Sequence, residues 1–422
     1  MSDIRFEGWL HRTGTGGVYQ DSAGNVGIAS TQPKTRLDIQ NGAFQIGPAG
    51  ICTATTVNTT NLINATQLSH RNLIINGAMQ VAQRGTSSTT SADYTADRFL
   101  VQWSGADESP THAQVDVAAG TTPYTSGFRK CVKVTNGNQT SGAGAADYMF
   151  IKYTVEAQDT AISGWNFKSA DSYITLSFWV KSSVAQNFYC YIEMPDSPEQ
   201  VYPFETGSLT ADTWTKITKS IPGNSNIVVN NDTGEGFKVF INQFWGTNFT
   251  DSGRALNTWA AFSSGERMPD FTSTWYTTND ATFELTGVQL EVGSVATPFE
   301  HRSFADELRR CQRYYFRIPY QGVASSGGVY LGSGKETGSN ARIAVDFPVP
   351  MRAVPSCAAS NLLSDDETSA TSANTVASVL ASTVEPDRGR VAFSGGSYSS
   401  GNSVSLSTGQ ATDSYLEGSA EL

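Results

Sequence analysis

Four large aromatic residues lie in or beside turn-rich segments in the middle of the chain, each with an amide or carboxylate close in sequence. A sugar ring presents a flat apolar face and a rim of hydroxyl groups, so its recognition needs aromatic rings together with amides or carboxylates. The candidate ligand-binding residues are Trp245, Trp259, Trp275, Tyr276, Asn248, Asp251, Asn279 and Asp280. Large aromatic residues also fill the cores of β proteins, so packing is the alternative role for each ring.

Enzymatic chemistry has weaker support in the sequence. Hydrolysis of a glycosidic bond needs two carboxyl groups across a cleft, one of them with a raised pKa. Acidic residues occur at several expected turns, but their spacing singles out no pair: Glu193, Asp196, Glu199, Glu205 and Asp212. The GSGK sequence at 332–335 lacks the Ser or Thr that a phosphate-binding loop needs next, and no GxSxG motif is present. We therefore expect no catalytic residues and a protein that is not an enzyme.

Histidine and cysteine residues are too dispersed to indicate a metal site or a cofactor. The four histidines have no HxH or HExxH spacing, and the five cysteines form no CxxC pair. An odd number of single cysteines is typical of reduced thiols in a protein that folds in a cytosol. We expect no cofactor and no metal ligands; the alternative is a structural calcium ion held by loop oxygens, although no DxDxDG run locates it.

Composition and charge argue against two classes of partner. The 422 residues carry 28 basic and 39 acidic side chains, which gives a formal charge of −11, and no long Lys/Arg run is present. Nucleic acid is therefore not an expected partner. No run of about 18 apolar residues occurs, and the charged start MSDIRFEGWLHR lacks the apolar core of a signal peptide. We expect neither membrane insertion nor secretion by a signal peptide.

The first 70 residues read as short strands separated by turns. GVYQ, VGIAS, RLDIQ and AFQIG are the expected strands, with the hairpin dipeptide Asn41-Gly42 between the last two. Such thin hairpins bury little surface alone, which favours an intertwined oligomer over a free-standing domain. Residues 51–69 are uncharged and rich in Thr, so they predict either an extended shaft or a flexible linker.

Residues 71–302 predict a β-sandwich of jelly-roll type. In YITLSFWVKSS and NFYCYIEM every second residue is apolar, which is typical of strands with one buried face. In ATFELTGVQLEVG the apolar register shifts across Gly287, so we expect a bulge there. At the two ends of this region, Arg71, Asn72, Asn76-Gly77, Pro298, Glu300, His301 and Arg302 indicate either an interface between copies or a local turn held by hydrogen bonds.

One helix is expected in residues 303–319, after the sandwich. Ser303 opens a capping-box pattern, and an apolar stripe follows it at helical spacing: Phe304, Leu308, Cys311 and Tyr315. Beyond it, residues 320–422 contain alternating segments such as ARIAVDF and a Ser/Gly-rich tail, which predict a small C-terminal β domain. The predicted fold class is therefore mainly β: an N-terminal hairpin or shaft segment, a sandwich, one connecting helix and a small β domain.

Several of these motifs resemble a jelly-roll module found in tail-fibre and tail-spike proteins of bacteriophages. They are RNLIINGAMQVAQRGTS, YTADRF, LSFWVKSS, KSIPG and, most specifically, TGVQLEVGSVATPFEHRSFADELRRCQRYY, and together the resemblance covers about half of the chain. The N-terminal segment FEGWLHRTGTGGVYQDSAGNVGIASTQPKTRLDIQ also resembles the start of fibres from marine phages, including cyanophages.

The resemblance implies a structural protein of the virion, assembled in the host cytoplasm. It implies a homotrimeric tail fibre whose residues 1–70 attach to tail or baseplate proteins. The β domains, with residues 320–422 as the distal tip, would contact host surface glycan or lipopolysaccharide. The alternatives are a capsule-degrading tail spike, a protein that decorates the capsid or tail, and a monomeric polysaccharide-binding module of a host enzyme.

Overall fold

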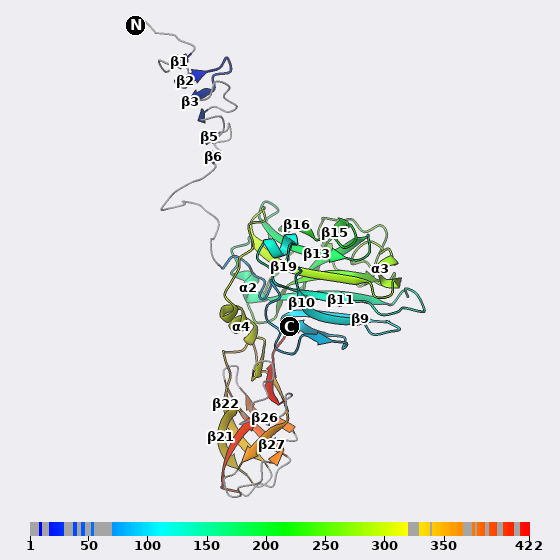
Figure 1. Ribbon diagram of the computed structural model, residues 1–422, viewed down its shortest axis with the longest axis vertical. Coiled ribbons are helices and arrows are strands. Elements are labelled where there is room, and N and C mark those ends of the chain that lie inside the picture. The colour runs from blue at the N-terminus through cyan, green and yellow to red at the C-terminus, as the bar shows by residue number, and fades with distance from the viewer. Residues whose placement is uncertain are drawn as a thin grey trace. The chain divides into compact units, whose positions relative to one another are not determined.

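The protein is mainly β, with several antiparallel sheets and, in the part that the structure describes, four short helices (Figure 1). The computed structural model describes residues 8–10, 17–28, 37–39, 44–46, 52–54, 70–319, 329–337, 340–365, 374–375, 378–384, 388–394, 400–408 and 414–422. Two compact units are present, Met1–Thr66 and Gln67–Leu422. None of the described helices has the length and hydrophobicity needed to span a bilayer.

The first unit holds one sheet of six short strands that follow one another in chain order. They are β1 (Gly8–Leu10), β2 (Gly17–Gln20), β3 (Val26–Ile28), β4 (Leu37–Ile39), β5 (Phe44–Ile46) and β6 (Cys52–Ala54). β3 and β4 are parallel, and the other neighbours are antiparallel. The strands expected in this region are therefore confirmed. The dipeptide Asn41-Gly42 and residues 55–69 of the expected shaft lie outside the described residues.

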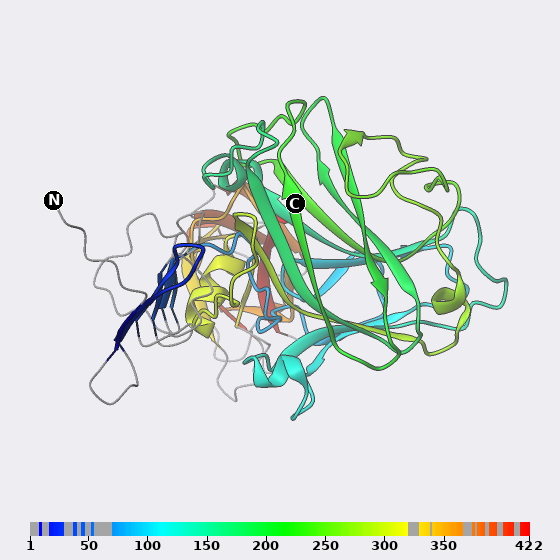
Figure 2. The ribbon, with the colours of Figure 1, turned by 90° about the horizontal axis from the view of Figure 1, so that it is seen from above.

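The second unit begins with two antiparallel sheets that pack face to face, which confirms the predicted sandwich (Figure 2). The six-stranded sheet has the order β16 (Thr215–Pro222), β13 (Tyr173–Ser182), β19 (Thr282–Val292), β11 (Lys130–Thr135), β10 (Thr111–Asp116) and β7 (Ser87–Ser88). The seven-stranded sheet has the order β18 (Ala260–Ala261), β15 (Gln200–Ser208), β14 (Asn187–Met194), β17 (Glu235–Trp245), β12 (Tyr148–Glu156), β9 (Phe99–Ser104) and β8 (Asp93–Ala96).

The core lies between these sheets and is built from alternate residues of each strand. The four alternating apolar residues of β13 are fully buried, and so are the four of β14: Ile174, Leu176, Phe178, Val180, Phe188, Cys190, Ile192 and Met194. Because side chains of a strand alternate between faces, the intervening residues of β14 must lie on the opposite face of its sheet. That outer face is also largely covered: Tyr191 on it is buried in a second hydrophobic cluster.

The bulge expected at Gly287 is present. The register between β13 and β19 shifts between Ser177 and Trp179, and Gly287 has φ of +65°. A Cβ atom on Gly287 would lie 2.7 Å from Phe128 and 3.0 Å from Trp179, so both the backbone and the space require glycine. The bulge returns the second half of β19 to the core face, where Val288 and Leu290 are fully buried.

The helix predicted after the sandwich is α4 (Phe304–Gln312), and Ser303 is its N-cap, accepting a hydrogen bond from the Asp306 amide. The apolar stripe is shorter than expected. Cys311 is buried in the sandwich core, but Phe304 on the first turn is 48% exposed, and Tyr315 belongs to β20 (Tyr315–Ile318). The helix stops because the aromatic and β-branched residues that follow pair with a strand. The other helices are α1 (Thr122–Thr125), α2 (Ala157–Ala161) and α3 (Thr274–Thr277).

Two further sheets are formed by the rest of the chain. One has the order β20, β29 (Tyr415–Ser419) and β23 (Ser356–Ser360). The other has the order β25 (Asn374–Thr375), β24 (Leu362–Asp365), β28 (Ser403–Thr408), β21 (Tyr330–Glu336), β22 (Ala341–Asp346), β27 (Arg388–Ser394) and β26 (Ser378–Val384). A separate small core includes Ile343, Val345 and Leu406.

Candidate functional site

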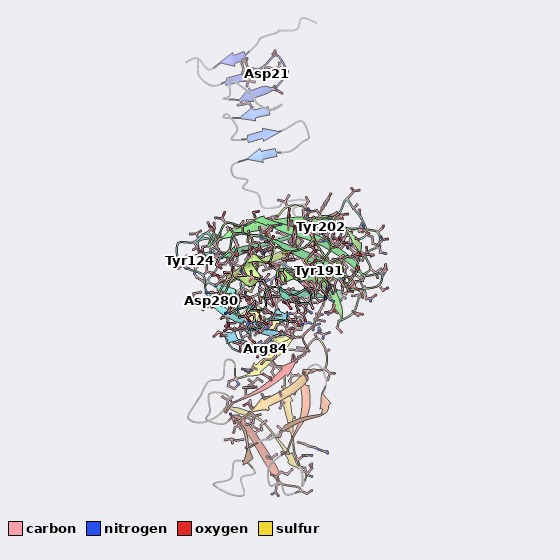
Figure 3. The ribbon with its side chains drawn as sticks, turned by 90° about the vertical axis from the view of Figure 1, so that its right-hand side faces the viewer. Asp21, Arg84, Tyr124, Tyr191, Tyr202 and Asp280 are labelled. Atoms are coloured by element: carbon pink, nitrogen blue, oxygen red, sulfur yellow. The ribbon has the colours of Figure 1, made fainter. Side chains whose placement is uncertain are left out.

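The outer face of the seven-stranded sheet carries a layer of aromatic side chains. The residues of β12, β14 and β17 that alternate with core residues form a second cluster: Phe150, Tyr191, Phe240 and Trp245, with the half-buried Tyr148 and Tyr189 beside them. Strand register explains the arrangement, because Tyr148 lies opposite Trp245 and Tyr191 lies opposite Phe240. Tyr191 is labelled within the sandwich in Figure 3.

The layer consists of two stacks of nearly parallel rings, which meet edge to face where Phe150 contacts Phe240 at 5.3 Å and 66°. The ring centroids of Phe150 and Trp245 are 5.4 Å apart with an interplanar angle of 4°, and those of Tyr148 and Trp245 are 5.0 Å apart at 23°. Tyr191 and Phe240 stack at 4.3 Å and 11°. Parallel stacking at these distances is favourable beyond the area it buries, so the layer is a rigid apolar platform.

The segment between β17 and α3 covers part of this platform. Met268 is fully buried in the aromatic cluster, and the guanidinium of Arg267 lies 4.9 Å from the Trp245 ring and 5.2 Å from the Phe262 ring. Trp245 retains only 5% exposure. Its indole N–H is buried and has no hydrogen-bond partner within the described parts of the chain.

The edge of the platform at Tyr148 is more open. Tyr148 and Gln102 are both half-buried, and the Gln102 amide lies 3.3 Å from the Tyr148 hydroxyl. Asn248 is exposed on the turn between Trp245 and Phe249, whose rings both contact Tyr148. Tyr148 is thus partly exposed at this edge, with the Gln102 amide beside its hydroxyl and the exposed Asn248 on the adjoining turn, and a sugar ring requires aromatic and amide groups of this kind.

The same face also carries a charged cluster. Glu193 on β14 lies opposite Lys238 on β17, and the ammonium of Lys238 is 2.8 Å from Glu193 and 2.7 Å from Glu235. Lys152 on β12 lies 3.7 Å from Glu235. Although burial alone would lower it, the Glu193 and Glu235 carboxylates raise the pKa of Lys238. The cluster is thus a fixed array of donors and acceptors on three adjacent strands.

Glu199 joins this cluster from the start of the next strand. Burial and the neighbouring Glu193 carboxylate, which shares a hydrogen bond with it, raise the pKa of Glu199 to about 7. Two carboxyl groups in hydrogen-bond contact cannot both ionise easily, so near neutral pH one of them holds a proton and can act as a donor. Glu193 and Glu199 are two of the five acidic residues considered from the sequence, whose spacing gave no reason to pair them.

Of the eight predicted ligand-binding residues, only three lie near this face. Trp245 and Asn248 belong to the site, and Asp251 lies on the covering segment, where its side chain accepts a hydrogen bond from the Gly253 amide at 2.7 Å. The backbone amide of Asp251 binds the Met268 carbonyl at 3.0 Å. This pair of contacts holds the segment closed over the aromatic rings.

Two of the other predicted aromatic residues pack in the core. Trp275 and Tyr276 have 0% exposure because α3 directs them between the sheets, where Tyr276 stacks on Phe244 at 4.4 Å. Packing accounts for the placement of these two rings. Trp259 is half-buried at the edge of the core: its indole donates to the Pro222 carbonyl at 2.7 Å, and its ring packs against Tyr202.

The remaining two predicted residues are exposed but lie elsewhere. Asn279 and Asp280 occupy the turn before β19, where Asp280 adopts φ of +57°. Figure 3 shows Asp280 well separated from Tyr191. Sequence reasoning missed Tyr148, Phe150, Tyr191 and Phe240, although aromatic residues on both faces of a strand, as in NFYCYIEM, are a signal that its outer face is covered too.

The two ends of the sandwich region meet through hydrogen bonds. The Asn72 amide donates to Glu300 at 2.9 Å, and Arg302 donates to Glu307 at 2.9 Å and to the Ile74 carbonyl at 3.1 Å. Two of these bonds join residues 228 positions apart, so they tie the two ends of the sandwich region together and do not form the local turn expected as one alternative. Beside it lies a hollow of about 200 Å³, whose lining includes Asn76, Arg129, Phe299, His301 and Phe304.

Comparison with known proteins gives distant structural similarity and no family assignment. No family model and no curated protein sequence matches the chain. The enzymatically active domain of tailspike protein 4 from bacteriophage CBA120 aligns over 53% of this chain and 21% of that chain, with 9% identity and a TM-score of 0.29. This chain thus spans about a fifth of the tailspike's length.

Two sugar-binding proteins align over a similar part of the chain. A putative sugar binding protein from Bacteroides thetaiotaomicron shares 14% identity over 53% of this chain and 100% of that chain, with a TM-score of 0.27. The N-terminal cellulose-binding domain of Cellulomonas fimi β-1,4-glucanase C shares 9% identity over 51% and 99% of the two chains, with a TM-score of 0.25.

Proposed function

We propose that this chain is the subunit of a homotrimeric phage tail fibre, a structural protein of the virion that binds a host surface glycan without cleaving it. The motifs between 71 and 315 that resemble tail-fibre modules support the viral assignment. In this proposal, residues 1–70 attach the fibre to tail or baseplate proteins, and assembly takes place in the host cytoplasm. A protein that decorates the capsid or tail is the structural alternative.

The observation that carries glycan binding is the open edge of the aromatic platform. Tyr148 stacks on Trp245, the Gln102 amide lies beside its hydroxyl, and Asn248 is exposed on the adjoining turn. A sugar ring would stack on the tyrosine while the amides bind its hydroxyls. Shallow sites of this kind bind weakly, so attachment would depend on several fibres acting together on one particle.

The trimer has support from the thin first unit. Val18 and Ile28 lie opposite each other on β2 and β3, and they are 39% and 40% exposed. A single sheet with a paired apolar surface gains stability when another copy covers it. The native mass of the full chain tests this part: three times 45.2 kDa is expected, and a monomer of 45.2 kDa would contradict it.

Binding to a panel of immobilised bacterial surface polysaccharides tests the glycan site. Tyr148→Ala should reduce binding at least tenfold, whereas Tyr148→Phe, which keeps the stacking ring, should reduce it much less. Tyr124→Ala is the matched control, because Tyr124 is a half-buried tyrosine on α1, at a different place in Figure 3. Equal binding by Tyr148→Ala and wild type, with both proteins folded, would contradict the site.

A capsule-degrading spike is the second candidate, and the Glu193 and Glu199 pair is the observation that favours it. The raised pKa of Glu199 would suit a general acid. Against it, glycosidase carboxyl groups are separated by roughly 5–9.5 Å to accommodate the substrate, whereas these two share a hydrogen bond. Release of reducing sugar from the bound polysaccharides, abolished in Glu199→Gln, would favour the enzyme over the fibre.

A further inference from the structure

Basic residues lie on three adjacent strands of the C-terminal seven-stranded sheet. After residue 328 the sequence contains five basic residues, and four of them lie on three adjacent strands: Lys335 on β21, Arg342 on β22, and Arg388 and Arg390 on β27. The fifth, Arg352, donates to the Ala420 and Glu421 carbonyls and is thus engaged elsewhere.

Strand register places Lys335 and Arg342 on the same face of the sheet. Lys335 lies directly opposite Arg342, and directly opposed residues share a face. Along β22 the side chains alternate, so that Arg342, Ala344 and Asp346 are exposed while the residues between them are buried. Two adjacent basic side chains therefore lie on an exposed face, in a chain of net charge −11.

A surface hollow lies at Lys335 and Arg342. Its volume is about 570 Å³, and its lining includes the hydroxyl-bearing residues Ser333, Thr337 and Ser400. Glu336 also borders it, but its side chain is fully buried and, as the next residue along β21, belongs to the opposite face. The hollow thus presents two cations and several hydroxyl groups to solvent.

The opposition of Lys335 and Arg342 is unfavourable without a counter-ion. Like charges directly opposite each other on antiparallel strands destabilise the pair. Within the described residues, neither side chain has an ion pair or a side-chain hydrogen bond that would neutralise it. A bound anion would relieve the repulsion, and a guanidinium offers a planar fork that matches a carboxylate or a phosphate.

We propose that this hollow, with Lys335 and Arg342 side by side, binds the carboxylate or phosphate groups of an acidic polysaccharide. The hydroxyl groups of the lining would bind the neutral parts of the sugar. The site goes beyond the proposed function, because it lies on a different sheet from the aromatic platform and selects its ligand by charge.

The test is binding of the full chain to immobilised polygalacturonate, which carries carboxylates, and to phosphorylated mannan, with neutral dextran as the uncharged reference. Lys335→Gln and Arg342→Gln should each reduce binding about tenfold, and binding should weaken as salt is raised. Lys216→Gln is the matched control, because Lys216 is an exposed lysine on β16 of the sandwich. Millimolar inorganic phosphate, added as a competitor, shows whether an isolated anion occupies the hollow.

Three outcomes would overturn the proposal: wild-type binding by both variants, equal loss in Lys216→Gln, or equal binding to dextran. Preference for one of the two acidic polymers would identify the anionic group. Arg342→Lys keeps the charge and folds as readily, and it should retain more binding than Arg342→Gln.

Discussion

Arg98 of the sandwich forms an ion pair with Glu421, more than 300 positions away in the sequence, and both side chains are nearly buried, at 2% and 9% exposure. The Arg98 guanidinium also lies 3.4 Å from the centre of the Tyr314 ring. Arg84, labelled in Figure 3 where the sandwich meets β20 and β29, lies 3.2 Å from the same carboxylate. Glu421 thus pairs with both guanidinium groups, of which Arg84 also lies 3.9 Å from Asp97, and it joins the C-terminal strands to the sandwich.

Glu421→Gln should therefore destabilise the second unit by about 3 kcal/mol, because it leaves Arg98 buried without a counter-charge. The free energy of unfolding in urea measures the effect. Glu266→Gln is the control, since Glu266 is exposed and should change stability by less than about 0.5 kcal/mol. Similar unfolding of the two variants would mean that Arg84 and Arg98 are stabilised without Glu421.

The sequence predicted the sandwich core because the period of two in β13 and β14 is a local property that survives in the fold. It did not predict the site, because the platform joins residues of β12, β14 and β17 through register alone. Trp275 shows what local sequence cannot predict. Its turn-rich neighbourhood suggested an exposed ring, but the short helix α3 directs the ring into the core, where its exposure is 0%. Local composition cannot distinguish these two outcomes.

The carboxyl pair was closer to being predictable. Glu193 and Glu199 flank a short turn, and the strands on either side of that turn pair Met194 with Gln200. A prediction of this hairpin from residues 195–198 would have placed Glu193 and Glu199 close together. The raised pKa of Glu199 still depends on burial and on the Glu193 carboxylate, and the Arg267 guanidinium opposes it by favouring the ionised form.

Gly287→Ala should lower the free energy of unfolding by about 3 kcal/mol, because left-handed backbone and a clash with Phe128 combine. Gly120→Ala separates the two causes: Gly120 has φ of +83° but nothing within 4 Å of the added Cβ. Gly120→Ala should lower the free energy of unfolding by only about 1 kcal/mol. Urea unfolding of both variants measures the two changes in the free energy of unfolding. Equal changes would show that Phe128 and Trp179 move away from the added methyl group at no cost.

Ser303→Ala should cost about 1 kcal/mol, because the hydroxyl accepts a hydrogen bond from the Asp306 amide at the start of α4. Ser303→Asp restores an acceptor and should recover most of the loss. The same urea measurement applies. If Ser303→Asp and Ser303→Ala are equally unstable, the cap contributes nothing and α4 is held by the burial of Cys311.

Glu199 should make the stability of the sandwich depend on pH. In the folded protein, burial and Glu193 raise its pKa to about 7 from the ordinary value of 4.5. The folded state therefore binds more protons than the unfolded chain between these values, and the free energy of unfolding falls as pH rises through that window. The fall should be on the order of 1 kcal/mol, since Glu199 is only partly buried and solvent screens its charge.

Urea unfolding at pH 5 and pH 8 measures this change. Glu199→Gln cannot ionise and should show a smaller decrease in stability between the two pH values than wild type, whereas Glu266→Gln should keep the full decrease. Glu193→Gln should also reduce the decrease, because it removes the carboxylate that opposes ionisation of Glu199. If Glu199→Gln and wild type lose stability equally, the two carboxyl groups do not share a proton, and the donor that Glu199 would offer to a sugar hydroxyl near neutral pH is absent.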